Sequence, residues 1–298
     1  MVNAKTATKE IATKTEAGLP AEFMDELAKA GEEHKEALGK DDMSIPFLQI
    51  LQSLSPQCTK GEAEFIKGAE PSDFLNTVTQ TLIKSRDDDN NAIKGARVLP
   101  ISYKRSFIEW VPRKEGGGIV QEYSVEEGLS IITVRSKETG QDIIQANSPI
   151  GTPGNQLNDT HTHFMFLINE DGTYEPVVLT MSSTQIKPSK DLNNMVSKQV
   201  LPDGRKAPRF FGIYDVTTQY RSNDQGSWYI WKFERATDVL ADGKMDMFRE
   251  AKEFVSGIET GEHKADHAKA GSGEANPSTG NGEGPTGGGK TKDDEVPF

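Results

Sequence analysis

The chain has a single cysteine, Cys58, and no long apolar stretch in its 298 residues. One thiol excludes an internal disulfide framework and a zinc site built from several cysteines. No segment approaches the roughly 18 apolar residues of a membrane-spanning helix, and residues 1–14 lack the apolar centre of a secretory signal. We therefore expect a soluble, cytoplasmic protein that does not associate with a membrane.

Catalytic and nucleotide-binding signatures are missing as well. There is no Gly-x-Ser-x-Gly elbow and no Walker sequence, and Gly116-Gly117-Gly118 indicates a flexible hairpin tip. His161-Thr162-His163 can place two imidazoles on one strand face, but no convincing third ligand is near, so a solvated or structural pair is expected. Asp87-Asp88-Asp89 lacks the glycine and the distal glutamate of a calcium loop and indicates a solvated hairpin. These absences predict a non-enzymatic protein with no cofactor and no metal.

Negative charge is in excess, with a formal net charge of −12, but it is unevenly distributed. The two ends, residues 1–44 and 241–298, together carry nine of the twelve excess negative charges. Two inner windows, residues 97–114 and 185–235, each have a net charge of +4. Because a phosphate chain responds to local potential, the charge of the whole chain does not exclude nucleic acid as a partner.

Apolar periodicity and composition divide the chain into four parts. Residues 1–44 predict a polar arm with one marginal helix, residues 45–258 a β-rich core, residues 259–292 a flexible Gly-rich linker, and residues 293–298 an acidic tip. Helices are expected at 244–258 and at 182–200, where Ser183 is a candidate cap and Pro188 predicts a broken or short helix. The short strand-like runs predict a mainly β, antiparallel barrel or sandwich; they span residues 45–51, 77–85, 96–102, 107–111, 129–135, 161–169, 176–182, 210–220 and 228–235.

The acidic tip has the composition of a portable peptide ligand. It places Asp293, Asp294 and Glu295 just before an apolar Val-Pro-Phe end at the free carboxylate. Phe298 can fill an apolar pocket while its carboxylate and the acids meet Lys or Arg at the rim. Pro297 restricts the backbone and lowers the cost of ordering it on a partner. The 34-residue linker lets the tip reach partners at a distance.

The linker and tip resemble those of bacterial and phage single-stranded-DNA-binding proteins, whose tails end in Asp-Asp-x-x-Pro-Phe. Asp293, Asp294, Pro297 and Phe298 match that ending. The resemblance implies an OB-barrel core, coating of single-stranded DNA in replication, repair and recombination, and docking of the tail onto replication and repair proteins. A homo-oligomer is compatible with it. Since the core is longer than that of a typical bacterial member, only these four residues are carried over. The fold we expect is an OB-like antiparallel barrel with insertions, short flanking helices and a disordered acidic C-terminal tail.

Two segments of the core combine cations with aromatic rings, which is the chemistry that binds a single strand without reading its sequence. Along residues 103–114, strand alternation puts Tyr103, Arg105 and Phe107 on one face and Lys104 on the other. The window 185–235 holds eight of the 22 aromatic residues beside nine cations, and about half of these aromatics are expected to be core. The predicted DNA-binding residues are Tyr103, Lys104, Arg105, Phe107, Trp110, Arg113, Lys187, Lys190, Arg205, Lys206, Arg209, Phe211, Tyr214, Tyr220, Arg221, Trp228 and Trp231.

Two other functions are compatible with the same sequence. A phage structural or scaffolding protein would use the acidic tail for solubility and would show no salt-dependent binding to single strands. An annealing protein or recombination mediator would bind single strands and also accelerate the pairing of complementary ones. The unusual core beside a bacterial-type tail favours a bacteriophage as the source.

Overall fold

The computed structural model describes residue 29 and residues 44–270, apart from 88–90, 92, 94 and 225. The chain divides into a unit of residues 1–43 and a second unit that begins at Ser44. Nearly all of the expected N-terminal arm, most of the linker and the whole acidic tip lie outside the described residues. Part of the expected aspartate loop, Asp88 and Asp89, lies outside them too.

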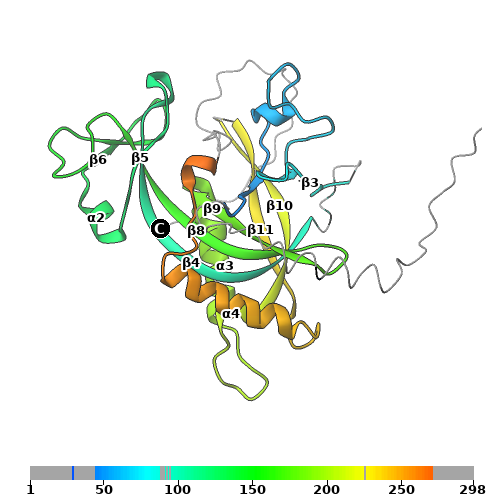
Figure 1. Ribbon diagram of the computed structural model, residues 1–298. Coiled ribbons are helices and arrows are strands. Elements are labelled where there is room, and N and C mark those ends of the chain that lie inside the picture. The colour runs from blue at the N-terminus through cyan, green and yellow to red at the C-terminus, as the bar shows by residue number, and fades with distance from the viewer. Residues whose placement is uncertain are drawn as a thin grey trace, which may run out of the picture. The chain divides into compact units, whose positions relative to one another are not determined.

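The described part of the second unit is mainly β, as predicted, with two antiparallel sheets (Figure 1). The larger sheet has the order β11-β10-β4-β8-β7-β6, with β5 paired to β4 and β9 paired to β8. Its strands are β4 (Ala96–Trp110), β5 (Ile119–Tyr123), β6 (Thr133–Arg135), β7 (Asp142–Ile144), β8 (Gln156–Ile168), β9 (Tyr174–Ser182), β10 (Gly212–Asn223) and β11 (Gly226–Asp238). The smaller sheet has β1 (Leu48–Ile50), β2 (Phe74–Asn76) and β3 (Leu82–Ile83). The open sheet is compatible with an OB-like fold.

Short helices connect and cover the strands. The α-helices are α2 (Val125–Ser130), α3 (Ile186–Ser197) and α4 (Met245–Glu259). The 3₁₀ turns are η2 (Pro56–Cys58), η3 (Arg113–Glu115), η4 (Ser183–Gln185), η5 (Arg209–Phe211) and η6 (His267–Ala270). Over the described residues, no helix combines the length and the apolarity needed to cross a membrane.

Strands β4 and β8 form a long antiparallel ribbon on which the rest of the sheet is built. They pair from Arg97 opposite Ile168 to Trp110 opposite Gln156, with one bulge between Pro100 and Ser102. Side chains of a strand alternate between two faces. We call the face that carries Tyr103, Arg105 and their partners His163 and His161 the inner face, and the opposite one the outer face.

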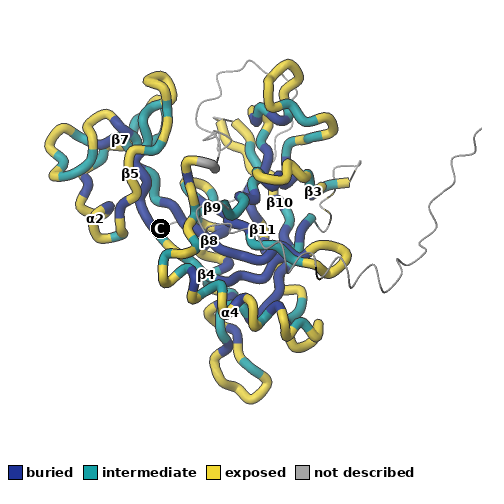
Figure 2. The backbone as a smooth tube through the Cα atoms, in the orientation of Figure 1, coloured by how far each residue is buried: buried dark blue, intermediate teal, exposed yellow. Residues whose placement is uncertain are grey.

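Each face of the ribbon has its own apolar core. On the inner face, Val98, Met165 and Leu167 pack with Leu192 and Val196 of α3. On the outer face, the side chains under α4 form a second cluster (Leu99, Ile101, Phe166, Ile168, Met247 and Ala251). Figure 1 shows α4 lying along the ribbon, and Figure 2 shows the buried middle of the strands between exposed turns. Full burial of such a side chain contributes about 1.5–3 kcal/mol.

A lobe formed by β5, α2, β6 and β7 is attached to the far end of the ribbon by strand pairing, by an apolar cluster and by one buried carboxylate. Glu109 is fully buried and accepts hydrogen bonds from the Tyr123 hydroxyl (2.6 Å), the Thr152 backbone (3.0 Å) and the Asn155 amide (2.5 Å). Burial alone would raise the pKa of Glu109, but these hydrogen bonds outweigh it and the pKa is lowered. The carboxylate thus joins β4, β5 and the loop before β8 in its charged form.

The outer edge of β11 is bonded to glutamine side chains rather than to another strand. The Gln52 amide donates to the Tyr229 carbonyl (3.0 Å) and accepts from the Tyr229 backbone N–H (2.9 Å). The Gln185 amide donates to the same carbonyl (3.0 Å) and accepts from the Trp231 N–H (3.1 Å). Two amides therefore satisfy the backbone groups that an edge strand would leave to solvent or to another chain.

Several elements differ from their sequence-based boundaries for identifiable reasons. Residues 96–110 form one strand because polar residues 103–106 are paired with β8 throughout. Residues 129–135 contain the end of α2, started by a capping box at Ser124 and Glu127, before β6 begins. Helix α3 is neither short nor broken, since Pro188 lies in the first turn, where its missing N–H has no helical acceptor to lose. Ser183 does not cap this helix; it begins η4.

Removal of the Glu109 carboxylate should destabilise the fold. Glu109→Ala leaves the Tyr123 hydroxyl and the Asn155 amide buried without their acceptor, so the free energy of unfolding should fall by about 3 kcal/mol. Urea titration followed by circular dichroism measures this. Glu115→Ala, at an exposed position of η3, is the matched control and should change stability by less than about 0.5 kcal/mol. Equal stability of the two variants would contradict the role of Glu109.

Candidate nucleic-acid interface

The outer face of β8 changes character halfway along the strand. Phe164, Phe166 and Ile168 are buried, and they pack under α4 and the segment that follows it. Toward the start of the strand the same face carries Thr160, Asn158 and Gln156. Because α4 covers only the apolar half, the polar half is left as the floor of a groove.

The groove has a volume of about 830 Å³ and is lined by segments from both sides of the ribbon. One wall comes from β1, η4 and the start of β11, including Gln49, Thr184 and Trp228. The other comes from the β4–β5 hairpin at 111–118 and from residues 136–143 of the lobe. His267 of η6 also lines the groove, so the chain after α4 returns to the edge of this opening.

The lining mixes apolar and polar side chains and is free of negative charge. Within the described part of the chain, none of the 28 lining residues is Asp or Glu, although 46 of the 298 residues of the protein are acidic. Arg113 and Lys114, both exposed on the hairpin, supply two positive charges. Apart from His267, the other polar side chains are amides and hydroxyls, which donate and accept hydrogen bonds without a net charge; those on β8 and β9 are Gln156, Asn158, Thr160, Thr180 and Ser182.

Two half-buried tryptophans face this lining. Trp110 lies at the end of β4, directly opposite Gln156, and Trp228 lies near the start of β11. The Trp228 indole nitrogen is buried and has no hydrogen-bond partner among the described residues. Trp231 also borders the groove but is only 4% exposed and stacks on Phe74 with ring centroids 5.0 Å apart. Trp110 and Trp228 are therefore the rings that remain for a ligand to contact.

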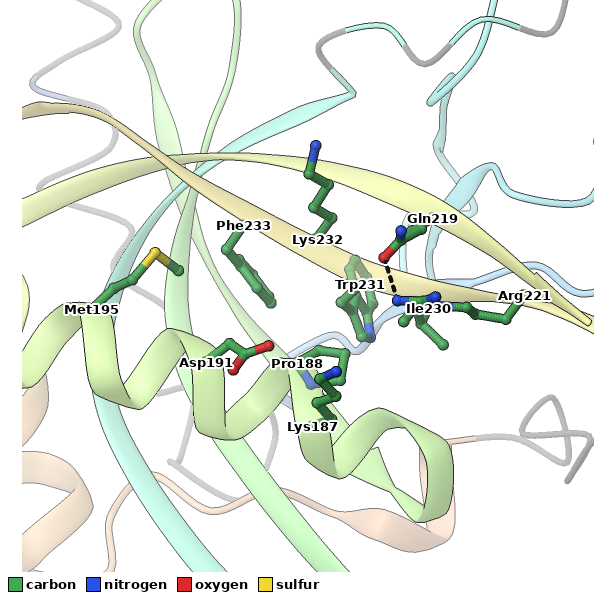
Figure 3. Close-up of a pocket in the computed structure, with 10 residues that line it drawn as sticks. All are labelled: Lys187, Pro188, Asp191, Met195, Gln219, Arg221, Ile230, Trp231, Lys232 and Phe233. Carbon is green, nitrogen blue, oxygen red and sulfur yellow. Dashed lines mark hydrogen bonds between the residues drawn. The ribbon is translucent and has the colours of Figure 1, made fainter. Parts of the chain in front are cut away.

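A second, smaller opening lies between α3 and the β10–β11 hairpin (Figure 3). This α3 cleft has a volume of about 100 Å³. Lys187 and Asp191 come from the helix, and Arg221 and Gln219 come from β10. The Arg221 guanidinium donates to the Gln219 amide oxygen at 3.0 Å, which fixes its position beside the hairpin.

The inner face holds a buried polar network that joins α3 to β8. Ser189 Oγ lies 2.7 Å from His161 Nδ1 and 2.7 Å from His163 Nε2, and Arg209 Nη2 lies 3.0 Å from His163 Nδ1. Because a guanidinium only donates, His163 Nδ1 accepts and its Nε2 carries the proton. Ser189 then accepts from His163 and donates to His161. The histidine pair is thus structural rather than solvated, and these were the two alternatives expected from the sequence.

Charges in this network are engaged within the protein. Arg105 makes a two-pronged ion pair with Asp159, at 2.8 and 2.7 Å. The Arg209 guanidinium lies over the Tyr103 ring at 5.6 Å, and burial lowers the pKa of Arg209 to about 10. Burial also sets the pKa of His163 well below its usual value, and the neighbouring Arg209 and His161 act in the same direction. These groups hold α3 on the sheet.

The predicted DNA-binding residues lie in several separate parts of the structure. Trp110, Arg113, Trp228 and Trp231 line the groove, and Lys187, Arg221 and Trp231 line the α3 cleft. Tyr103 and Arg105 are half-buried beside the histidine network, to which Arg209 bonds, while Phe107, Phe211 and Tyr214 are core residues with rings inaccessible to a base. Lys104 pairs with Glu122 at 2.8 Å, Lys190 is exposed on α3, and Tyr220 is 51% exposed beside Tyr229. Arg205 and Lys206 lie in the loop before η5 and line neither opening. The four tip residues lie outside the described chain.

Sequence reasoning missed the polar floor of the groove. The strand expected at 161–169 begins at Gln156 instead, so Gln156, Asn158 and Thr160 were not assigned to it. Leu157 is the single apolar residue between Gln156 and Thr160, so this stretch has neither the alternation nor the apolar run that marks a strand. Among the described residues, no three His, Cys, Asp or Glu side chains are grouped to hold a metal ion.

A family model described as Pam3 phage gp34-like protein matches residues 13–264, which is most of the chain. No curated protein and no solved structure matches the chain.

The buried histidines should make stability depend on pH. His163 stays neutral in the folded protein, whereas in the unfolded chain it takes up a proton as pH falls through about 6.5. Protonation therefore favours the unfolded state, and the free energy of unfolding should decrease below pH 6.5 by up to about 1.4 kcal/mol per pH unit for this residue. Urea titrations at pH 7.5, 6.5 and 5.5 measure the slope.

His163→Gln keeps a polar side chain that does not titrate, so this variant should show a shallower slope over the same pH range. Some slope should remain, because burial lowers the pKa of His161 and His267 too. An unchanged slope in the variant would show that His163 does not titrate differently in the two states.

Proposed function

We propose that this chain, which belongs to the Pam3 phage gp34-like protein family, binds single-stranded DNA without reading its sequence. The observation that carries the proposal is the groove: an acid-free, amide-rich opening with two accessible tryptophans in an otherwise acidic protein. The protein would coat exposed strands in replication and recombination and would perform no catalysis. Its place of action would be the cytoplasm of the infected cell.

The groove offers what an unpaired nucleotide needs. Base stacking on an aromatic ring is worth about 1–3 kcal/mol per base and tolerates any base, since every base has a π-face. Trp110 and Trp228 come from different strands and line the same opening, so two bases can stack within one site. Amides such as Gln156 and Asn158 can donate to or accept from base edges, which paired bases do not expose to them.

Electrostatics favour the same site. The protein as a whole repels a phosphate chain, because it has a net charge of −12. In the groove this repulsion is reduced, since no carboxylate lines it and Arg113 and Lys114 stand on the hairpin beside it. Few cations also mean that stacking, rather than charge, supplies most of the affinity.

The C-terminal tip would recruit partners. Its acids and terminal Phe298 have the chemistry of a peptide that docks on an apolar pocket with a basic rim. The described chain ends at η6, whose His267 lines the groove.

Fluorescence anisotropy of a labelled oligo-dT tests the proposed function. The protein should bind oligo-dT more tightly than a duplex of the same length, and binding should weaken as salt rises. Absence of binding to oligo-dT even at low salt would overturn the proposal and favour a structural role in the virion. Acceleration of strand pairing in the same samples would instead point to an annealing protein.

Removal of a stacking ring should weaken binding without harming the fold. Trp110→Ala and Trp228→Ala should each reduce oligo-dT affinity by about 1–3 kcal/mol, which is roughly 5- to 150-fold. Anisotropy titrations measure the change. Trp110→Phe keeps an aromatic face and should retain most of the affinity. If Trp110→Ala binds as tightly as the unchanged protein, the groove is not the binding site.

Deletion of residues 293–298 should raise oligo-dT affinity at low salt. The three acids of the tip compete with phosphate for local positive charge when the tail is near the groove. The difference should disappear at high salt, where this competition is screened. Titration of the full chain and the deletion variant at 20 and 300 mM salt measures it. Equal affinities at both salt concentrations would exclude such competition.

A further inference from the structure

The groove and the α3 cleft meet at one cross-strand pair. Trp228 lines the groove, and the residue directly opposite it on β10, Arg221, lines the cleft. Opposed residues of an antiparallel pair share a face, with Cβ atoms about 4.5–5.5 Å apart. A nucleotide whose base stacks on Trp228 therefore has its phosphate within reach of the Arg221 guanidinium.

The segment between the two openings is residues 183–185, which contact β11 through the Gln185 amide. We call this segment the bridge. Ser183, Thr184 and Gln185 line the groove, and the helix that follows directly brings Lys187 into the cleft. The Gln185 amide is bonded to the backbone of Tyr229 and Trp231. A single-stranded DNA that leaves the groove thus has to pass over this bridge before it reaches the cleft.

The cleft suits a phosphate rather than a base. Its volume of about 100 Å³ is smaller than the ~150 Å³ of a cavity that accepts benzene. In Figure 3, Lys187 lies on the helix side and Arg221 on the strand side, with their charged groups near the same end of the cleft. Lys232 points away from the helix and pairs with Glu234 at 2.7 Å. Asp191 is the one negative charge among the described residues that line the cleft.

We infer that the α3 cleft is a backbone subsite for the same single strand, in which Lys187 and Arg221 bind a phosphate that follows the base stacked on Trp228. This inference rests on the proposed function and extends it. The groove binds bases by stacking and the cleft binds the backbone by charge, so the two subsites respond differently to salt and to the length of the oligonucleotide.

The test is the salt dependence of binding over a length series of oligo-dT from 4 to 16 nucleotides. Each phosphate neutralised by a cation contributes about −0.7 to the slope of log affinity against log salt for a single strand. Short oligonucleotides that occupy only the groove should give a shallow slope. Beyond the length that crosses the bridge, the slope should become steeper by about 0.7, because Lys187 and Arg221 together neutralise one further phosphate.

Variants separate the cleft from general charge effects. Lys187→Ala and Arg221→Ala should each make the slope for long oligonucleotides shallower by up to about 0.7, the contribution of the one phosphate that they share, and leave short ones unchanged. Asp191→Asn removes the opposing charge and should tighten binding of long oligonucleotides only. Lys206→Ala removes an exposed cation that lines neither opening and should leave both slopes unchanged.

The outcomes distinguish the two proposals. Binding of short and long oligonucleotides with the same slope, or equal effects of Lys187→Ala and Lys206→Ala, would overturn the cleft subsite while leaving groove binding intact. No binding at any length would overturn the proposed function itself.

Discussion

The register of the β4–β8 ribbon is the constraint on which the rest of this structure depends. A slip of one residue in a strand moves every side chain to the opposite face. The bulge between Pro100 and Ser102 is such a shift within β4 itself, because it changes which residues face inward on its two sides. Before the bulge Leu99 faces α4; after it Tyr103 and Arg105 face α3. The same shift turns Trp110 to the outer face, where the groove lies.

The distribution of apolar and polar residues along the ribbon then determines which parts of its two faces are covered by helices and which remain open. On the outer face the apolar half of β8 is sealed by α4, and the polar half is not. On the inner face polar residues are covered by α3, but every strong charge there has a partner: Arg105 meets Asp159 and Arg209 meets His163. Turning either cation outward to a ligand would leave its present partner unpaired. Cations for a phosphate chain come instead from the β4–β5 hairpin, from α3 and from Arg221 of β10.

Much of the fold could be predicted from sequence, and the limits have physical causes. The strands at 176–182, 210–220 and 228–235 carry dense apolar residues and lie close to the observed β9, β10 and β11. The amphipathic helix at 244–258 is α4 almost residue for residue. The polar start of β8 was missed because pairing with β4, a contact distant in sequence, makes it a strand. Tyr214 and Trp228 could not be assigned to core or surface in advance, since strands of a curved sheet bury different faces at different points along their length. Tyr214 is fully buried, and Trp228 borders the groove.

The side-chain contacts at the edge of β11 explain how the apolar core of the sheet can lie directly next to the groove. A further strand paired to β11 would satisfy Tyr229 and Trp231 equally well, but its backbone would occupy the space beside Trp228. Gln52 and Gln185 reach the same backbone groups with slender amides, each bonded at both its oxygen and its nitrogen. Because the amides leave no backbone group of Tyr229 unpaired, the edge is protected against pairing with another chain. The sheet can therefore end at β11 and leave an opening whose lining is free of carboxylates and accessible.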